Sequence, residues 1–289
     1  YQHQQNLIKL LLKMVLESYI CICIIDYTKI MFTMKKYLPY IVIFLTTIFL
    51  FAPIFINPDI LLNRGNDLTE FFWPIFLNTK KSILIYYQLP FWNNVFFGGT
   101  PLLPDPQSFL FYIPNIIFLV LPMNVGFIVS FILHIFLAGV GMFLLTNKTL
   151  KFSSTASLFS AIIYILSPKL AAFLEAGHFG LVTSWTYLPF IVFFLIKLIK
   201  KPQLKTSILL SLSLVGLFFS HLPTFLIFTL SSFPFVIYFC YTKRVKLPKV
   251  LFWLIATGVI TFIISSPSLI PQLKWQNQTT RQLLLNEAD

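Results

Sequence analysis

Two carboxylates three residues apart, Asp67 and Glu70, are the side chains of this sequence best suited to acid–base chemistry. Residues at positions i and i+3 are neighbours on a helix surface, so both carboxylates would lie on one face of a short helix. At the boundary of a bilayer such a carboxylate can serve as a general base. Asp67 and Glu70 are therefore the candidate catalytic residues. The alternative is that two acids in a watery loop are merely solvated.

Aromatic residues follow the acids directly and would position them. Phe71, Phe72, Trp73 and Phe76 have the amphipathic or apolar character of residues that sit at the head-group level of a membrane. We expect them to hold the short helix in the head-group region and to leave the acids directed toward a cleft.

The acids belong to a stretch, residues 58–124, that is rich in proline, glycine and aromatic residues. Trp92 and Asn93 precede a pair of glycines, a mixture typical of a structured loop whose surface holds sugars or lipid head groups. Asp105 lies between two prolines, so its backbone is stiff and its carboxylate is held in place. We expect these three residues to contact a substrate.

Further ionisable residues stand close to the ends of apolar runs. Glu175, His178 and His221 are of this kind, and ionisable groups at such positions are functional candidates. The alternative is that the two histidines are interfacial hydrogen-bonding residues or helix caps. Lys274 and Arg281 would either meet a lipid phosphate or be ordinary surface charges.

The sequence assigns no cofactor. A ligand spacing of the His-Glu-x-x-His kind is missing, which singles out no metal ligands but leaves a divalent cation open. A glycine-rich phosphate loop, a Ser-His-Asp order and a nucleotide fingerprint are also missing, which argues against a nucleotide enzyme of the cytosolic type. The three cysteines form neither a disulfide framework nor a metal-binding spacing.

The composition sets the fold class. Of the 289 residues, 57% are hydrophobic and 10% are charged, and the mean hydropathy is +0.84, so a soluble domain would lack the polar surface to cover its core. The 21 Lys and Arg outnumber the 9 Asp and Glu, but they form short clusters between apolar runs. That pattern is typical of cytoplasmic loops in membrane proteins and argues against a nucleic-acid partner. We expect an all-α, polytopic transmembrane bundle.

The apolar runs divide the chain into five parts. Residues 1–33 carry frequent charges, which favours either an interfacial amphipathic helix or a leader that is not native, with the natural start at Met31 or Met34. Residues 34–57 are predicted to form the first transmembrane helix. Residues 58–124 form a large extracytoplasmic loop with interfacial helices, 125–267 a transmembrane bundle and 268–289 the start of an extracytoplasmic segment in a truncated chain. The seven expected spans are Tyr37–Ile56, Val125–Leu145, Ser154–Ser167, Leu181–Ile199, Ser207–Phe219, Thr224–Tyr241 and Val250–Ser265.

Two details of this topology follow from length and proline. The apolar piece Phe109–Leu121 is too short to span and is expected to form an interfacial or re-entrant helix. Pro168 and Pro223 are expected to mark breaks or ends of helices.

Charge fixes the expected orientation. If Lys35 and Lys36 are cytoplasmic, successive crossings place twelve bases and no acid on one side. The acids between the spans fall on the opposite side, together with fewer bases. This segregation predicts a multi-pass protein of the plasma (inner) membrane whose 58–124 loop is extracytoplasmic.

An ordered series of motifs resembles a known family. The series runs through LPFWNNVFFGGTPLL, FYIPNIIFLVLP, LHIFLAGVGMFLL, AIIYILSPKLAAFLEAGHFGLVTSWTYLPFI, SHLPT and SSPSLIPQLKW, between Lys35 and Arg281. It is similar to the N-terminal part of the bacterial YfhO-like membrane proteins of the GT-C glycosyltransferase type. The resemblance implies an enzyme that moves a sugar from a polyprenyl-phosphate donor to a glycan, lipid or protein acceptor on the outer face.

The resemblance also implies residue roles. An acid in the first exterior loop of such enzymes acts as a base or orients the acceptor, and Asp67 holds that position. Many members carry an Asp-x-Asp or Glu-x-Asp pair, whereas this chain has Asp67-Leu-Thr-Glu70, so the role of Glu70 stays open. Glu70, Asp105 and His178 would shape the sugar site, and Lys274 or Arg281 would face the lipid phosphate.

Two alternatives from other classes remain. A transporter or flippase of lipid-linked sugars would carry ionisable groups near the midplane of several spans, where this sequence offers only His134, which is better explained as a helix-packing residue. A non-catalytic assembly subunit would use the exterior loop only to bind a partner.

Overall fold

The structure is a computed structural model that describes residues 34–61, 65–96, 98–242, 244–245 and 247–279. The chain divides into two compact units, residues 1–45 and 46–289. The leader expected at residues 1–33 and Arg281 lie outside the described residues. A helix covers residues 34–50, and everything below concerns the second unit.

The described part of the second unit is almost entirely helical, with one small two-stranded hairpin. Its elements are α2 (Ala52–Ile56), η1 (Pro58–Leu61), η2 (Leu68–Phe72), α3 (Trp73–Leu84), β1 (Trp92–Asn93), β2 (Thr100–Pro101), η3 (Ile113–Ile116), α4 (Ile117–Val120), α5 (Met123–Leu144), η4 (Leu145–Thr149), α6 (Ser154–Ile165), α7 (Pro168–Glu175), α8 (Phe179–Lys200), α9 (Leu204–Ser220), α10 (Leu222–Thr242), α11 (Leu247–Trp275) and η5 (Gln276–Gln278).

Within the described residues, five helical segments are long and apolar enough to cross a membrane. They are Met123–Thr149, Ser154–Glu175, Phe179–Lys200, Leu222–Thr242 and Leu247–Gln278. All five contain a predicted span, so an all-α protein with membrane-length apolar helices is confirmed. The count of seven is not, because α9 has only 17 residues and the helix at 34–50 is not among the five.

Capping residues and prolines set several helix ends. The Ser153 side chain accepts a hydrogen bond from the Ala156 N–H and so caps α6. Pro168 stands in the first turn of α7, and Pro223 in the first turn of α10, where the missing N–H costs nothing. The expectation that Pro168 and Pro223 mark helix boundaries is therefore confirmed.

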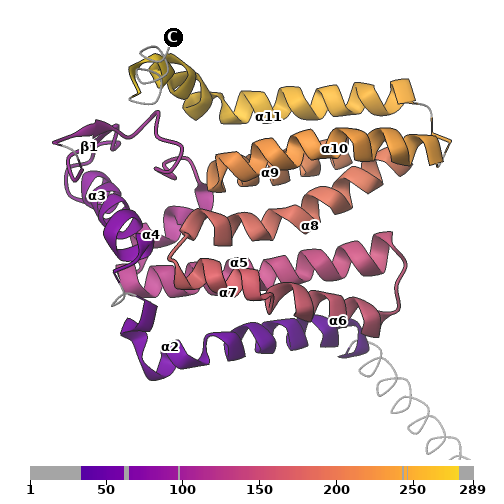
Figure 1. Ribbon diagram of the computed structural model, residues 1–289, viewed down its shortest axis with the longest axis horizontal. Helices are drawn as coiled ribbons and strands as arrows, with labels where there is room; N and C mark the ends of the chain where they lie inside the picture. Colours follow the sequence, from indigo (N-terminus) through magenta and orange to yellow (C-terminus); the bar gives the residue numbers. More distant parts are fainter. Residues whose placement is uncertain (1–33, 62–64, 97, 243, 246, 280–289) are drawn as a thin grey trace, which may run out of the picture. The chain divides into compact units, whose positions relative to one another are not determined.

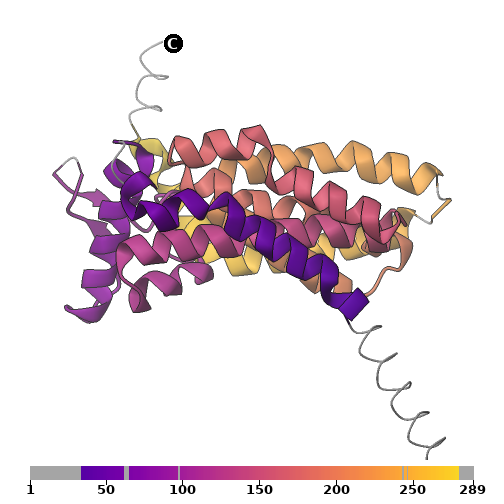
Figure 2. The same ribbon diagram turned by 90° about the horizontal axis from the view of Figure 1, so that it is seen from below.

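The long helices pack as an antiparallel bundle (Figures 1 and 2). Helix α8 lies between α5 and α9, α6 packs on α5, and α11 packs on α9. Where α8 meets α9, the Tyr187 ring covers Gly216 so closely that an added Cβ would come within 2.2 Å of the ring. The core here consists of Ile191, Leu195, Leu198, Ile199, Leu210 and Leu217.

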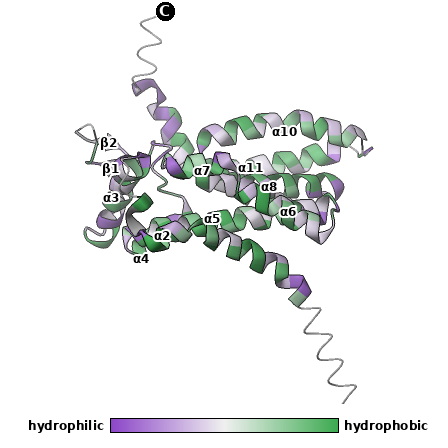
Figure 3. Cartoon of the chain, turned by 60° about the horizontal axis from the view of Figure 1, so that its bottom comes forward, coloured by the Kyte–Doolittle hydropathy of each residue, from purple (hydrophilic) through white to green (hydrophobic). Residues whose placement is uncertain are grey.

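The two ends of the bundle differ in charge. Figure 3 shows hydrophobic residues along much of the long helices and hydrophilic residues toward their ends. At one end the Lys200 ammonium donates to the Thr149 carbonyl at 3.3 Å, which places the C-terminus of α8 beside η4. The bases near this end are Lys148, Lys151, Lys197, Lys200, Lys201, Lys205, Arg244 and Lys249, and the acids Asp67, Glu70, Asp105 and Glu175 belong to the segments at the other end.

The segment 66–122 folds onto the bundle where α5 and α8 begin (Figure 1). An aromatic core joins them: ring centroids lie 5.7 Å apart for Phe72 and Phe109, 5.6 Å for Phe76 and Phe127, and 5.1 Å for Phe109 and Phe179. Phe72 and Phe76 are only 4% and 3% exposed. The expectation that these two rings anchor the segment in lipid head groups is therefore wrong, because they are buried against other rings.

The expected helix over Phe109–Leu121 is also broken into pieces. Phe109 has a positive φ of 53°, and the chain then forms the short elements η3 and α4 before Pro122 caps α5. Pro114 in the first turn of η3 lacks the N–H that a continuous helix would need there.

Candidate functional site

Asp67 and His178, 111 residues apart in sequence, are in direct contact. The Nδ1 atom of His178 lies 2.9 Å from Oδ2 of Asp67. Asp67 stands immediately before η2, and His178 immediately before α8. The contact brings together the predicted catalytic acid and one predicted substrate-binding residue.

A close approach of two backbones positions this pair. Gly177 has a φ of +73°, and a Cβ there would come within 2.5 Å of the Leu68 nitrogen. The Asn66 side-chain amide donates to the Glu175 carbonyl at 3.2 Å across the same approach. Only glycine meets both the left-handed conformation and the lack of space, so Gly177 lets the start of η2 lie against the start of α8.

The geometry of the pair assigns the protons. An ionised carboxylate can only accept, so Nδ1 of His178 carries the hydrogen and donates it to Asp67. In the neutral ring, Nε2 of His178 then holds the lone pair. The two side chains are 56% exposed for Asp67 and 42% for His178, so solvent and solutes reach them.

The pair lines a cavity of about 450 Å³. The cavity lies between the start of η2, the loop at 106–109, the first turn of α8 and the junction of α9 with α10. Its lining residues are Asp67, Phe72, Pro106, Gln107, Phe109, His178, Gly180, Leu181, Ser220, His221, Leu222 and Pro223. The size falls in the range of small-molecule sites.

Two helix N-termini meet at this cavity, those of α8 at Gly180 and Leu181 and of α10 at Leu222 and Pro223. The N-terminus of a helix carries a partial positive charge and unpaired N–H groups, which favour an anion. The cavity thus combines a proton-accepting pair with a positive electrostatic field, although its lining contains no Lys or Arg among the described residues.

His221, a predicted substrate-binding residue, also lines the cavity. Its Nδ1 accepts a hydrogen bond from the Thr224 N–H at 3.2 Å and lies 2.7 Å from the Thr224 hydroxyl. Because a backbone N–H only donates, Nδ1 is the acceptor and the proton is on Nε2. Burial, and then the proximity of His178, lowers the pKa of His221. His221 is thus a neutral donor.

Asp105 does not line the cavity but shapes the loop that does. Its Oδ1 accepts the Gln107 N–H at 2.8 Å, a turn that brings Pro106 and Gln107 to the cavity wall. Burial raises the pKa of Asp105, partly offset by the Gln107 N–H. The sequence analysis expected the Asp105 carboxylate to be held in place and to contact a substrate. In the structure this carboxylate is held by the backbone N–H of Gln107.

Glu70, the second predicted catalytic acid, lies outside the lining of the cavity. Its Oε1 lies only 3.2 Å from where a Cβ of Gly65 would stand. The 68–72 segment is a π-helix, in which the i, i+3 geometry of an α-helix does not apply. The two carboxylates therefore do not share the cavity as expected.

The remaining predicted site residues lie elsewhere. Trp92 and Asn93 form the strand β1, which pairs with β2, and the Asn93 side chain accepts the Val95 N–H at 3.0 Å. Glu175 contributes its backbone carbonyl to Asn66. Lys274 is exposed near the end of α11.

Sequence reasoning missed Gln107, Ser220, Gly177 and Asn66. Asn66 directly precedes Asp67, and Gly177 directly precedes His178. Their position next to predicted site residues could have pointed to them. Gln107 and Ser220 are ordinary polar residues, and only the fold brings them to the cavity.

Within the described residues, no group of three or more His, Cys, Asp and Glu side chains is arranged to hold a metal ion. No family model, curated protein or solved structure matches this chain.

Proposed function

We propose that this chain is a membrane glycosyltransferase that moves a sugar from a polyprenyl-phosphate donor to an acceptor hydroxyl at the extracytoplasmic face. The observation that carries the proposal is the 2.9 Å contact between Asp67 and His178 in the wall of an accessible cavity. The motif resemblance to GT-C enzymes supplies the reaction class.

The pair supplies the general base. Asp67 accepts the Nδ1 hydrogen of His178 and fixes the tautomer and orientation of the ring. Nε2 of His178 takes the proton of the acceptor hydroxyl as its oxygen bonds to the sugar carbon, while the bond from that carbon to the lipid phosphate breaks. The positive charge that forms on the imidazole is stabilised by the Asp67 carboxylate.

The leaving phosphate is served by the ends of α8 and α10. The N-terminal partial positive charges of both helices lie at the cavity, and His221, whose proton is on Nε2, also lines it. Positive charge of this kind stabilises the negative charge that develops on a leaving group. The expected role of Lys274 or Arg281 at the lipid phosphate stays a prediction, since Arg281 lies outside the described residues.

The membrane topology completes the proposal. The helix at 34–50 and α9 cross the bilayer together with the five longer helical segments, which gives seven spans. The end that carries Lys148, Lys201 and Lys205 is cytoplasmic by the positive-inside rule, and the cavity end is extracytoplasmic at the plasma membrane.

Transfer by an Asp67→Asn variant tests the proposal. Membranes that contain the protein receive a panel of polyprenyl-phosphate-linked radioactive hexoses, and label is followed into envelope lipid, glycan and protein. We expect Asp67→Asn to lose about 10²–10⁴-fold in rate, the usual contribution of general base catalysis, at unchanged membrane expression. Glu70→Gln is the matched carboxylate control and should keep most of the activity. Full activity of Asp67→Asn would contradict the proposal.

A further inference from the structure

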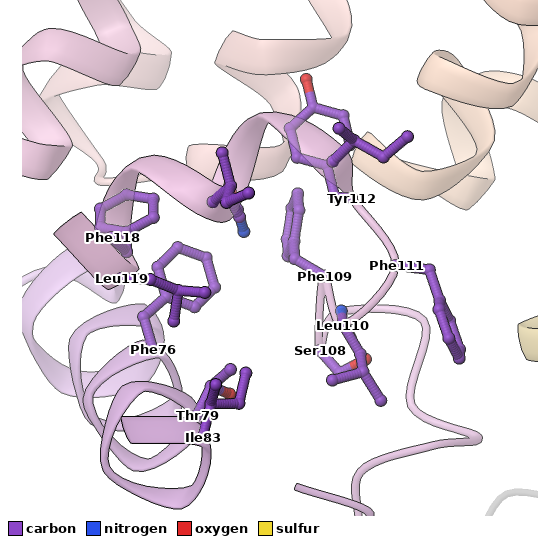
Figure 4. A pocket seen from close by; sticks show the side chains of 13 residues that line it. Phe76, Thr79, Ile83, Ser108, Phe109, Leu110, Phe111, Tyr112, Phe118 and Leu119 are labelled. Atoms are coloured by element: carbon purple, nitrogen blue, oxygen red, sulfur yellow. Dashed lines mark hydrogen bonds between the residues drawn. The ribbon is translucent and has the colours of Figure 1, made fainter. Parts of the chain in front are cut away.

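A second cavity lies on the other side of Phe109. Its volume is about 340 Å³, and Phe109 lines both this cavity and the one that holds Asp67. Figure 4 shows side chains of α3 facing the 108–112 segment across it. The lining residues are Phe76, Thr79, Ile83, Ser108, Phe109, Leu110, Phe111, Tyr112, Ile113, Asn115, Ile116, Phe118 and Leu119.

Most of this lining is hydrocarbon or aromatic. Thr79 and Asn115 belong to the lining, but their Oγ1 and Oδ1 atoms are buried away from the open space of the cavity. The cavity therefore offers an apolar ligand mainly van der Waals contact and few hydrogen bonds.

The edge of this cavity is an exposed aliphatic surface. Ile113, Ile116 and Val120 of η3 and α4 are 83%, 64% and 78% exposed, and the first two also line the cavity. An exposed apolar group of this kind marks a membrane or protein contact. In a protein with membrane-length helices, the bilayer is the apolar phase at hand.

Charge favours a lipid as the occupant. The Lys80 ammonium donates to the Leu121 carbonyl at 2.7 Å, so a positive charge stands next to Val120 of the aliphatic surface. Lipid head groups carry phosphate, and a cation beside an apolar surface is the usual partner of an anionic membrane.

We propose that this cavity binds one hydrocarbon chain of a membrane lipid. The chain enters over Ile113 and Ile116 without crossing water. Phe109 separates it from the polar cavity. The inference concerns binding and stands whether or not the protein transfers a sugar.

Photolabelling tests the proposal. The whole chain in lipid nanodiscs is irradiated with a 16-carbon alcohol that carries a diazirine near its far end, and labelled peptides are mapped by mass spectrometry. We expect label concentrated in residues 76–83 and 108–119 and displaced by unlabelled hexadecanol. Label spread evenly over the exposed faces of α10 and α11, or label that hexadecanol does not displace, would overturn the proposal.

Two variants sharpen the test. Leu119→Trp fills the cavity and should remove most of the local label, whereas Leu230→Trp, at a 67% exposed position of α10, should not. Equal loss of label in the two variants would contradict binding of the chain in this cavity.

Discussion

At the scale of single residues, the site depends on proton positions that hydrogen bonds fix. Asp67 makes Nδ1 of His178 a donor, so in the neutral ring the lone pair is on Nε2. Thr224 makes Nδ1 of His221 an acceptor, so the proton of that ring is on Nε2. One imidazole is therefore arranged as a base and the other as a donor, although both residues occupy similar positions just before a helix.

The stability of the protein should decrease as the pH is lowered, because His221 has a lowered pKa in the folded state. Its pKa lies below the ordinary value of 6.5 as a result of burial and the nearby His178. Below about pH 6.5 the unfolded chain binds more protons than the folded one, so the melting temperature falls until the lower pKa is passed. His221→Gln should flatten this dependence in melting curves of the detergent-solubilised protein between pH 8 and pH 5. An equally steep dependence in the variant would exclude His221 as its source.

Asp105→Asn should stabilise the protein at neutral pH. Burial raises the pKa of this carboxyl, so its ionised form is unfavourable in the folded state, and an Asn oxygen can still accept the Gln107 N–H. We expect the melting temperature to rise by roughly 2–4 °C, the shift that about 1 kcal/mol produces in a chain of 150–250 residues. A lower melting temperature would mean that the charge itself is needed.

The residue scale is also where the sequence was least informative. Asp67, His178 and His221 were predicted as site residues, yet the contact between Asp67 and His178 could not be predicted, because it depends on how two distant loops approach. The placement of Glu70 was wrong because α-helical spacing was assumed for a segment that is a π-helix. The prediction that Phe72 and Phe76 lie among lipid head groups was wrong. A single sequence does not distinguish an aromatic residue that is buried in the protein from one at the membrane interface.

At the scale of elements, the site is made by the approach of η2 to the start of α8. The short segments before these elements hold Asp67 and His178, and the aromatic core beneath them holds the 66–122 segment on the bundle. Long apolar helices were predictable from composition and length. The packing of the 66–122 segment on the bundle was not, since it is built from many ring contacts between distant residues.

Gly177→Ala tests this approach. The added Cβ would stand 2.5 Å from the Leu68 nitrogen at a φ of +73°, so the two loops must separate and the Asp67–His178 contact should be lost. We expect transfer activity close to that of Asp67→Asn together with a lower melting temperature. Gly98→Ala is the matched control, because Gly98 has a φ of +74° with nothing within 4 Å. A comparable loss in Gly98→Ala would show that backbone conformation alone accounts for the effect.

At the scale of the whole molecule, the described part of the second unit has a basic end and an end that carries the acids and the cavity. The cluster that includes Lys148, Lys201 and Lys205 lies where positive-inside topology places the cytoplasm. The site must then face the other side of the membrane, where a lipid-linked donor would be presented.

Cysteine labelling checks this orientation. In a background without Cys21, Cys23 and Cys240, Tyr87→Cys on the exposed loop after α3 should react with a membrane-impermeant maleimide in intact cells. Lys201→Cys at the basic end should react only after permeabilisation. The reverse pattern would place the cavity on the cytoplasmic side and exclude a reaction at the extracytoplasmic face.

The central claim is that Asp67 and His178 act as one unit. The most direct measurement is the rate of hexose transfer by Asp67→Asn, by His178→Gln and by the double variant, each with membrane expression matched to the native protein. Residues that act together give strongly non-additive losses. We predict that the double variant is no more than a few-fold slower than the slower single variant. Losses that multiply would show two independent contributions and contradict the account.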